Sequence, residues 1–256
     1  MVAQEKGGMS RFIYIRDSSK ELGKGHSYHS SVVSQRLAPF EAEAKRDAII
    51  IDALIPTVGM TYAAANDAKL VLFNCLRPEA QGLADIVVTP DISPCFENVR
   101  TVYDAASDLK TTWFRGPRYW FLRDEFNLPP EKPMPFYDVG ILIGGTDPLD
   151  LTERIREQLK GMRVLVLKGR DIAFQMRMCE VMLTGCGQSF WESLKGGVPA
   201  IPFASNEAQA KQYGPTFQLG EVGSIRTAIK RQEWAMPSER WQIGEGVDEV
   251  IAEILR

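Results

Sequence analysis

The stretch 181–203 constrains the fold more than any other part of the chain. An apolar run reaches Thr184, small residues follow up to Gly187, and aromatic and leucine side chains then recur at helical spacing. Gly196 and Gly197 end this helical pattern before a second apolar run. The order predicts a strand, a tight turn, a helix and another strand, which is the repeating unit of an α/β fold.

The turn in this stretch has the residues expected of a phosphate site. Gly185 and Gly187 let the backbone approach a ligand, and free N–H groups at the start of the helix favour a phosphate. Glu192, one turn into the helix, could then reach the hydroxyls of a ribose. An ordinary crossover with glycines that serve packing has the same pattern, so the functional interpretation depends on the rest of the chain.

Strand and helix patterns alternate in both halves of the chain, which predicts parallel sheets. In the first half the predicted strands are 11–16, 48–52, 69–73 and 85–88, with helices at 27–37 and 57–66. In the second half the further strands are 139–143 and 163–167, with helices at 149–159, 171–178, 225–231 and 247–255. Only about four strands fit in the first half.

The periodic pattern fades between Asp91 and Pro135, where prolines, aromatics and charges take over. Four prolines between positions 129 and 135 predict a stiff, extended connection. We therefore expect an N-terminal Rossmann-like domain at 1–128 and a C-terminal domain at 129–256.

Composition excludes several classes of protein. The 256 residues are 45% hydrophobic and 25% charged with a net charge of −3, which is typical of a soluble globular protein without a global basic field. The four cysteines form no Cys-x-x-Cys pair, and His26 and His29 are the only histidines, so a structural zinc site is not expected. The polar stretch from Met1 to Met9 and the lack of a long apolar run predict a cytoplasmic protein without a membrane span.

Three loops of the second half, at 144–147, 185–189 and 205–209, follow predicted strands. Parallel strands present these loops at one edge of the sheet, where they can surround a single diphosphate. No Lys-Ser or Lys-Thr pair follows a glycine-rich loop, which argues against a P-loop enzyme, and a dinucleotide fingerprint is absent.

His26 follows the first predicted strand and has an ordinary pKa suited to proton transfer near neutrality. Asp17 or Asp52, each near a strand end, could orient its ring. A loop histidine that donates to a backbone carbonyl is the alternative. The stretch 113–123 interleaves arginine with aromatics, as nucleic-acid contacts do, although a segment that links and packs two domains has the same composition.

Several motifs occur in one order along the chain: 16–19 with 23–26, 116–126, 144–148, 187–192 and 206–209. From about Arg11 to Gln209 this series resembles the UDP-sugar hydrolase of pseudaminic acid biosynthesis and related glycosyltransferases of the GT-B fold. The resemblance implies two Rossmann-like domains that face each other across a cleft, with the nucleotide diphosphate held by the C-terminal domain. It also makes a linking role for 113–123 the favoured interpretation.

The resemblance implies a role for each matching residue. His26 would be the base that deprotonates water or an acceptor hydroxyl. From its place at the end of the first strand, we expect Asp17 to be the second catalytic residue. The substrate-binding set would be Gly145, Thr146 and Ser189 at the diphosphate, Glu192 at the ribose, Asn206 and Gln209 at the sugar or its β-phosphate, and Gly25, Gly144, Gly187 and Gln188 in the same motifs. No metal or other cofactor is expected.

The chain departs from this family at three places. His29 stands where the family has an arginine, two residues separate Asn206 from Gln209, and each half is shorter by roughly one βα unit. We therefore expect a glycosyltransferase that moves a sugar from a UDP-sugar donor to an acceptor that is a glycan, lipid, small molecule or modified nucleic acid. A UDP-sugar hydrolase and a non-catalytic nucleotide-sugar-binding module are the alternatives.

Overall fold

The computed structural model describes residues 12–16, 31–44, 47–52, 68–73, 83–90, 111–126, 135–144, 147, 149–205, 207–238 and 241–256. These residues form two compact units, one made of 12–121 together with Trp241–Arg256, the other of Leu122–Arg240. Each unit contains one sheet in which every strand pairing is parallel. The expected α/β class with two parallel sheets is confirmed.

The sheet of the first unit follows chain order. Its strands are β1 (Phe12–Arg16), β2 (Ala48–Asp52), β3 (Lys69–Phe73), β4 (Ile86–Thr89) and β5 (Thr112–Arg115). Every residue of β3 and β4 is buried, and all but Lys69 and Thr89 are apolar, as expected of central parallel strands. The first unit also has α-helix over the described residues 31–37, within the helix expected at 27–37, and the 3₁₀ helices η1 (Ala38–Glu43) and η2 (Pro117–Tyr119).

The strand β5 corrects the expectation of about four strands. Its residues are only partly buried, and it pairs with β4 from Ile86↔Thr112 to Thr89↔Arg115. Its sequence, Thr-Trp-Phe-Arg, has neither a continuous apolar run nor a clean alternation, so periodicity gave no strand signal there. In the stretch 113–123, the first three residues belong to β5, and Pro117–Tyr119 form the 3₁₀ helix η2.

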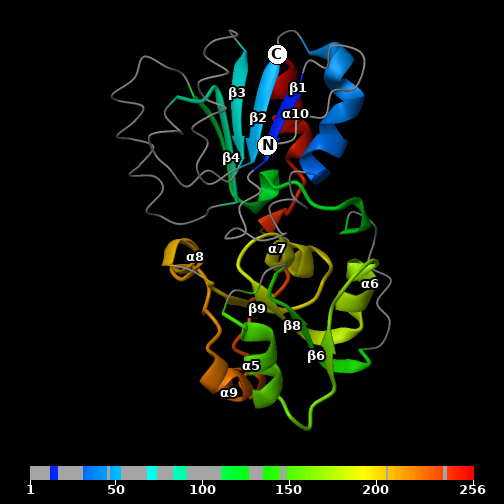
Figure 1. Cartoon of the computed structure of the whole chain (residues 1–256), viewed down its shortest axis with the longest axis vertical. Coiled ribbons are helices and arrows are strands. Elements are labelled where there is room, and N and C mark those ends of the chain that lie inside the picture. The colour runs from blue at the N-terminus through cyan, green and yellow to red at the C-terminus, as the bar shows by residue number, and fades with distance from the viewer. Residues whose placement is uncertain are drawn as a thin grey trace. The chain divides into compact units, whose positions relative to one another are not determined.

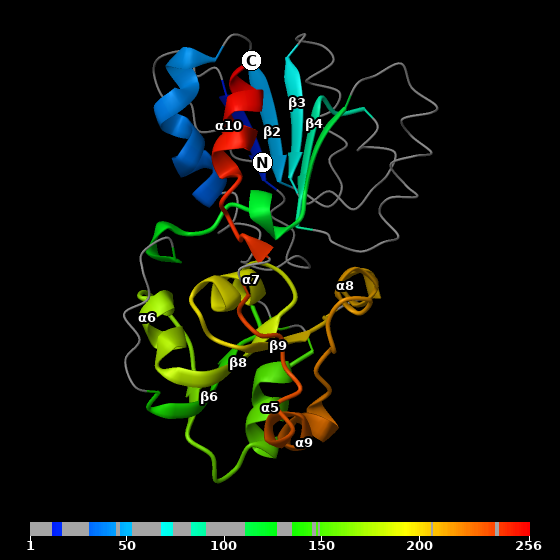
Figure 2. The same cartoon turned by 180° about the vertical axis from the view of Figure 1, so that it is seen from behind.

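The last helix, α10 (Val247–Leu255), belongs to the first unit, whereas the sequence placed it in the C-terminal domain. Lys69 of β3 explains the difference, because its Nζ donates to the carbonyls of Glu253 at 2.8 Å and Ile254 at 3.2 Å. These carbonyls end the helix and have no partner within it. Figures 1 and 2 show α10 in red against the strands of this sheet.

The second unit has the strand order β7-β6-β8-β9. The strands are β6 (Tyr137–Leu142), β7 (Val164–Val166), β8 (Cys179–Gly185) and β9 (Ala200–Phe203). The helices are α5 (Leu151–Gln158), α6 (Ile172–Arg177), α7 (Gln188–Lys195), α8 (Glu207–Tyr213) and α9 (Ile225–Lys230), with short 3₁₀ helices η3 (Asp124–Phe126) and η4 (Val222–Ser224).

The chain reverses direction across this sheet. From β6 it moves outward to β7, and it then returns past β6 to β8 and β9. The order therefore switches between β6 and β8, and helices cover both faces. Open α/β sheets bind their ligands at the carboxyl ends of the strands beside such a switch point.

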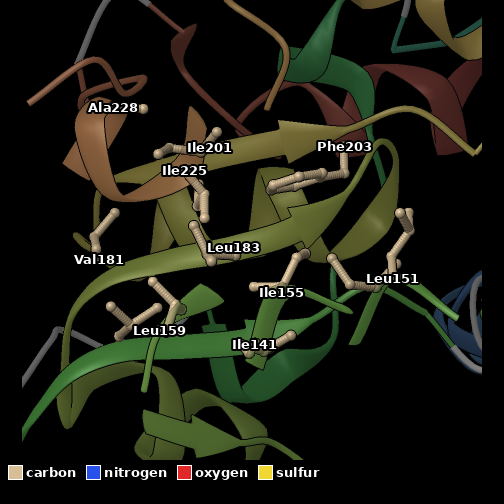
Figure 3. Close-up of a cluster of buried hydrophobic side chains, with 12 residues drawn as sticks. Ile141, Leu151, Ile155, Leu159, Val181, Leu183, Ile201, Phe203, Ile225 and Ala228 are labelled. Carbon is tan, nitrogen blue, oxygen red and sulfur yellow. The ribbon is translucent and has the colours of Figure 1, made fainter. Parts of the chain in front are cut away.

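One face of this sheet packs into a large apolar core (Figure 3). Ile141 of β6, Leu183 of β8 and Ile201 of β9 lie under Ile155 of α5 and Ile225 of α9, each at most 1% exposed. Helices α6 and α7 contact β8 but contribute no residue to this core, so they cover the opposite face.

The second unit begins at Leu122, seven residues before the boundary expected from the prolines. The side chains of 123–126 explain this, because Arg123 bonds to Glu192 of α7 and Glu125 accepts from the amide of Ala173 in α6. Within the described ranges, no helix is long and apolar enough to cross a membrane.

Replacing Lys69 with Met is expected to lower the free energy of unfolding by about 1.5–3 kcal/mol, because the charged donor to two helix-end carbonyls is lost. Chemical denaturation measures the change. Lys230→Met, at an exposed position, is the control and should stay within about 0.5 kcal/mol of the original protein. Equal stability of the two variants would contradict a stabilising role for the Lys69 contacts.

Candidate functional site

Glycines at the switch point leave open space above the sheet edge. Gly144 follows β6 with a φ of +129°, and Gly187 follows β8 with a φ of +134°. A Cβ added to either would meet no atom within 4 Å. Gly185 differs, because a Cβ there would lie 2.2 Å from the backbone oxygen of Ile143. Gly185 therefore serves packing, while Gly144 and Gly187 combine a left-handed conformation with free space.

Helix α7 begins at this open corner without a side-chain cap. Gly187 is its N-cap residue, and the backbone amide and hydroxyl of Ser189 have no hydrogen-bond partner in the described part of the chain. Unsatisfied amides at a helix start carry partial positive charge and bind anions. The start of α7 therefore has the geometry of an anion site.

Helix α5, which follows β6, begins differently. The carboxylate of Asp147 accepts from the amides of Leu151 at 2.8 Å and Thr152 at 2.7 Å. A protein carboxylate thus occupies the position that an external anion would take at this helix. Of the two helices that follow the switch-point strands, α7 is the one with an open start.

Glu192 is buried and fully engaged. Its side chain is 1% exposed, and its two oxygens accept from Nε of Arg123 at 2.8 Å and from Nη2 of Arg123 at 2.6 Å. The side-chain amide of Gln188 adds a third bond, at 2.9 Å to Oε1. In this arrangement a ribose reaches the carboxylate only if Arg123 moves, so the expected ribose contact stays a prediction.

Gln209 of α8 ties two of the predicted loops together. Its Nε2 donates to the carbonyl of Cys186 at 3.1 Å, while its Oε1 accepts from the amide and the hydroxyl of Ser205, each at 2.9 Å. The turn after β8 and the turn after β9 are therefore fixed relative to each other. Gln209, which was expected to contact the sugar or its β-phosphate, here holds two turns of the sheet edge together.

An aromatic cluster anchors α7 to the rest of the unit. The indole N–H of Trp191 donates to the hydroxyl of Tyr213 at 3.0 Å, and both rings contact Phe190 and Phe217. Trp191 is 1% exposed. These side chains form a core beneath the helix and leave its N-terminal amides at the sheet edge.

Two buried side chains at the end of β8 differ in their chemistry. Burial raises the pKa of the Cys186 thiol to about 12, so it stays protonated near neutrality and is a poor nucleophile. The hydroxyl of Thr184 is fully buried and has no hydrogen-bond partner among the described residues. Thr184 alternates with Leu183, so it points to the face that α7 covers.

The loop after β7 brings positive charge to the same edge. Lys168 and Arg170 are exposed, and neither side chain has an ion-pair partner in the ranges that the structure describes. Gln175 orders this loop, because its Nε2 donates to the carbonyls of Arg170 at 2.7 Å and Lys168 at 3.1 Å. An anion near the switch point would be attracted by these charges.

The structure brings Gly187, Gln188, Ser189 and Glu192 together in the first half of α7. Gln209 bonds to the adjoining turn at Cys186, and Gly144 follows the neighbouring strand β6. Six predicted site residues lie outside the described residues: Asp17, Gly25, His26, Gly145, Thr146 and Asn206. Within the described chain, no group of three or more acidic, histidine or cysteine side chains is placed to hold a metal ion.

The parts of the site that depend on contacts between distant residues could not be predicted from the sequence. Arg123 was part of a quoted motif, yet nothing in its spacing showed that it meets Glu192, 69 residues later. Lys168 and Arg170 gave the only local signal, since they flank a glycine directly after a predicted strand. The buried hydroxyl of Thr184, which has no hydrogen-bond partner among the described residues, gave no signal in the sequence.

No protein-family model matches the chain. An uncharacterized protein from Methanocaldococcus jannaschii is 26% identical over 226 residues, which cover 73% of this chain and 46% of that protein. The chain thus spans less than half of the length of the curated relative that it matches.

Similar solved structures include an Arabidopsis thaliana protein complexed with UDP-L-rhamnose, with a TM-score of 0.48, 13% identity and coverage of 94% of this chain and 82% of that chain. A UDP-glucosyltransferase from Polygonum tinctorium overlaps with a TM-score of 0.45 and 13% identity, covering 87% of this chain and 72% of that chain. At these values the overlaps assign neither a family nor an activity to this chain.

Replacing Thr184 with Val is expected to leave the free energy of unfolding unchanged or to raise it by up to about 1 kcal/mol, because an unsatisfied buried hydroxyl is removed. Ser193→Ala is the matched comparison, since Ser193 is equally buried but donates to the carbonyl of Val198 at 3.0 Å. It should cost about 1–2 kcal/mol. Denaturation curves give both values, and a larger loss for Thr184→Val than for Ser193→Ala would show that the hydroxyl is bonded.

Proposed function

We propose that the chain binds a nucleotide sugar, linked through UDP, and transfers its sugar to an acceptor. The observation that carries the proposal is the open, uncapped start of α7 beside the strand-order switch, with Gly187 and Ser189 at the corner. This is the arrangement in which backbone amides receive a diphosphate.

Three further features of the second unit support a phosphate ligand at α7. Asp147 fills the competing helix start at α5, so α7 has the open start of the two helices described after the switch-point strands. Gln209 fixes the neighbouring turns, so the donors do not have to be ordered when the ligand binds. Lys168 and Arg170 add positive charge at the same edge.

The proposed reaction breaks the bond between the anomeric carbon and the diphosphate oxygen. The acceptor oxygen forms the new bond to that carbon, and its proton passes to His26, with Asp17 orienting the ring. The diphosphate leaves as an anion, and the amides at the start of α7 stabilise the charge that develops on it. We assign Gly25, Gly145, Thr146 and Asn206 to substrate contacts by the motif resemblance, and the proposal needs no resident metal or cofactor.

The sequence motifs favour transfer over hydrolysis because His29 replaces the arginine of the hydrolase pattern. The acceptor is a glycan, lipid, small molecule or modified nucleic acid. The first half is expected to shape the acceptor site, and it is shorter here than in the family. Turnover with candidate acceptors of each class therefore identifies the acceptor.

Replacing His26 with Asn is expected to reduce UDP release from a UDP-sugar by about 100-fold or more while UDP binding is kept, because the base is lost and the diphosphate site is not. Release of UDP from a panel of UDP-sugars, with and without candidate acceptors, measures turnover, and calorimetry measures binding. Acceptor-independent release matched by free sugar would show a hydrolase. Absence of turnover with retained UDP binding in the original protein would show a binding module.

Replacing Ser189 with Ala is expected to weaken UDP binding about fivefold, the loss of roughly one hydrogen bond of about 1 kcal/mol. Ser224→Ala is the control, because Ser224 is an exposed residue of η4 whose hydroxyl bonds within its own turn to the carbonyl of Glu221. Calorimetric titration with UDP compares the two variants. Equal affinities would place the diphosphate away from the start of α7.

A further inference from the structure

The contact between Arg123 and Glu192 is a two-point contact to a buried carboxylate. The guanidinium donates through Nε and Nη2 to the two carboxylate oxygens, at 2.8 and 2.6 Å. Planar, two-point contacts of this kind fix orientation as well as charge. Because Glu192 is 1% exposed, removing Arg123 would leave a buried carboxylate without its counter-charge.

Arg123 is itself held from several sides. Its Nη1 lies 3.1 Å from Oε1 of Glu125, and its guanidinium lies over the ring of Phe126, 5.1 Å from the ring centre. Glu125 in turn accepts from the amide of Ala173, at 3.4 Å. The guanidinium is therefore a fixed point from which the segment before β6 contacts both α6 and α7.

The contact reaches the first turn of α7 through two side chains. Glu192 accepts from the side-chain Nε2 of Gln188, the first residue of the helix. Arg123 orients the side chain of Glu192, and Glu192 in turn orients the side chain of Gln188. Gln188 lies between Gly187 and Ser189, the two residues proposed to contact the diphosphate. Three donors already occupy the carboxylate, which leaves little capacity for the two hydroxyls of a ribose.

We infer that Arg123 is a positioning residue for the diphosphate: acting through Glu192 and Gln188, it holds the first turn of α7 in place. The inference rests on the proposed function and deepens it. It assigns Glu192 to support of the diphosphate site in place of contact with the ribose. Arg123 also offsets the negative charge of Glu192, so this carboxylate repels an anion bound one turn away less than an unpaired one would.

Three ligands separate this role from ribose recognition: UDP, 2′,3′-dideoxy-UDP and inorganic pyrophosphate. The second lacks the ribose hydroxyls, and the third lacks the nucleoside. Arg123→Met is expected to weaken the binding of all three by one common factor of about tenfold, because the shared diphosphate site is disturbed. Arg123→Lys, which keeps the charge without the two-point contact, should recover part of the loss. Calorimetry at a temperature where melting curves show full folding gives the affinities.

A matched control exists at the other end of the same sheet. Arg163 contacts Asp138 through Nε at 2.9 Å and Nη2 at 2.5 Å, at the amino ends of β6 and β7. Arg163→Met removes an arginine–carboxylate contact from the same unit but far along the strands from α7. Its affinity for the three ligands should equal that of the original protein.

Each outcome decides between the roles. Weaker UDP binding with unchanged binding of dideoxy-UDP and pyrophosphate would overturn the inference and assign Glu192 to the ribose. Unchanged affinity for all three ligands in a folded Arg123→Met protein would reduce the contact to a stabilising one. If Arg123→Met does not fold, Glu192→Gln is the second variant, because glutamine keeps the shape of the side chain and one acceptor oxygen. Glu192→Gln should weaken the binding of all three ligands by the same factor. An original protein that binds none of the three would remove the proposed function itself.

Discussion

The reversal of strand order between β6 and β8 is the constraint on which the second unit depends. All four strands are parallel, so each connection must cross the sheet on one of its faces and every outgoing turn opens at the same edge. Because the chain leaves β6 in one direction and β8 in the other, the two connections diverge at this edge. The buried core under α5 and α9 keeps the strands in this register.

Glycines at this edge have two distinct causes that look identical in the sequence. Gly185 is required because the backbone of Ile143 passes too close for any side chain. Gly187, two residues later, is required by its left-handed φ and has open space beside it. The first glycine lets the turn approach β6, and the second leaves the start of α7 accessible. Packing and access are therefore separate requirements met by neighbouring residues.

The sequence predicts what is locally periodic. The bounds of β2, β3 and α10 agree with the structure residue for residue, because buried strands and amphipathic helices leave their period in the chain. Periodicity did not predict β5, because its residues are only partly buried. It also did not predict the unit to which α10 belongs, because this helix is held by Lys69 on a distant strand. The contact of Glu192 with Arg123 could not be predicted either, because Arg123 lies in a segment without a periodic pattern. Contacts between distant residues have no local signal, and a binding site consists mostly of such contacts.

A comparison of α5 with α7 shows why the position of an acidic side chain matters. Asp147 precedes its helix and binds the first amides directly, as a carboxylate near a helix start generally does. Glu192 carries the same charge but lies past the first turn, where it is buried and bonded to Arg123. A carboxylate that competed for the amides of α7 would close this site as Asp147 closes the other. The buried ion pair therefore keeps an acidic residue close to an anion site without filling it.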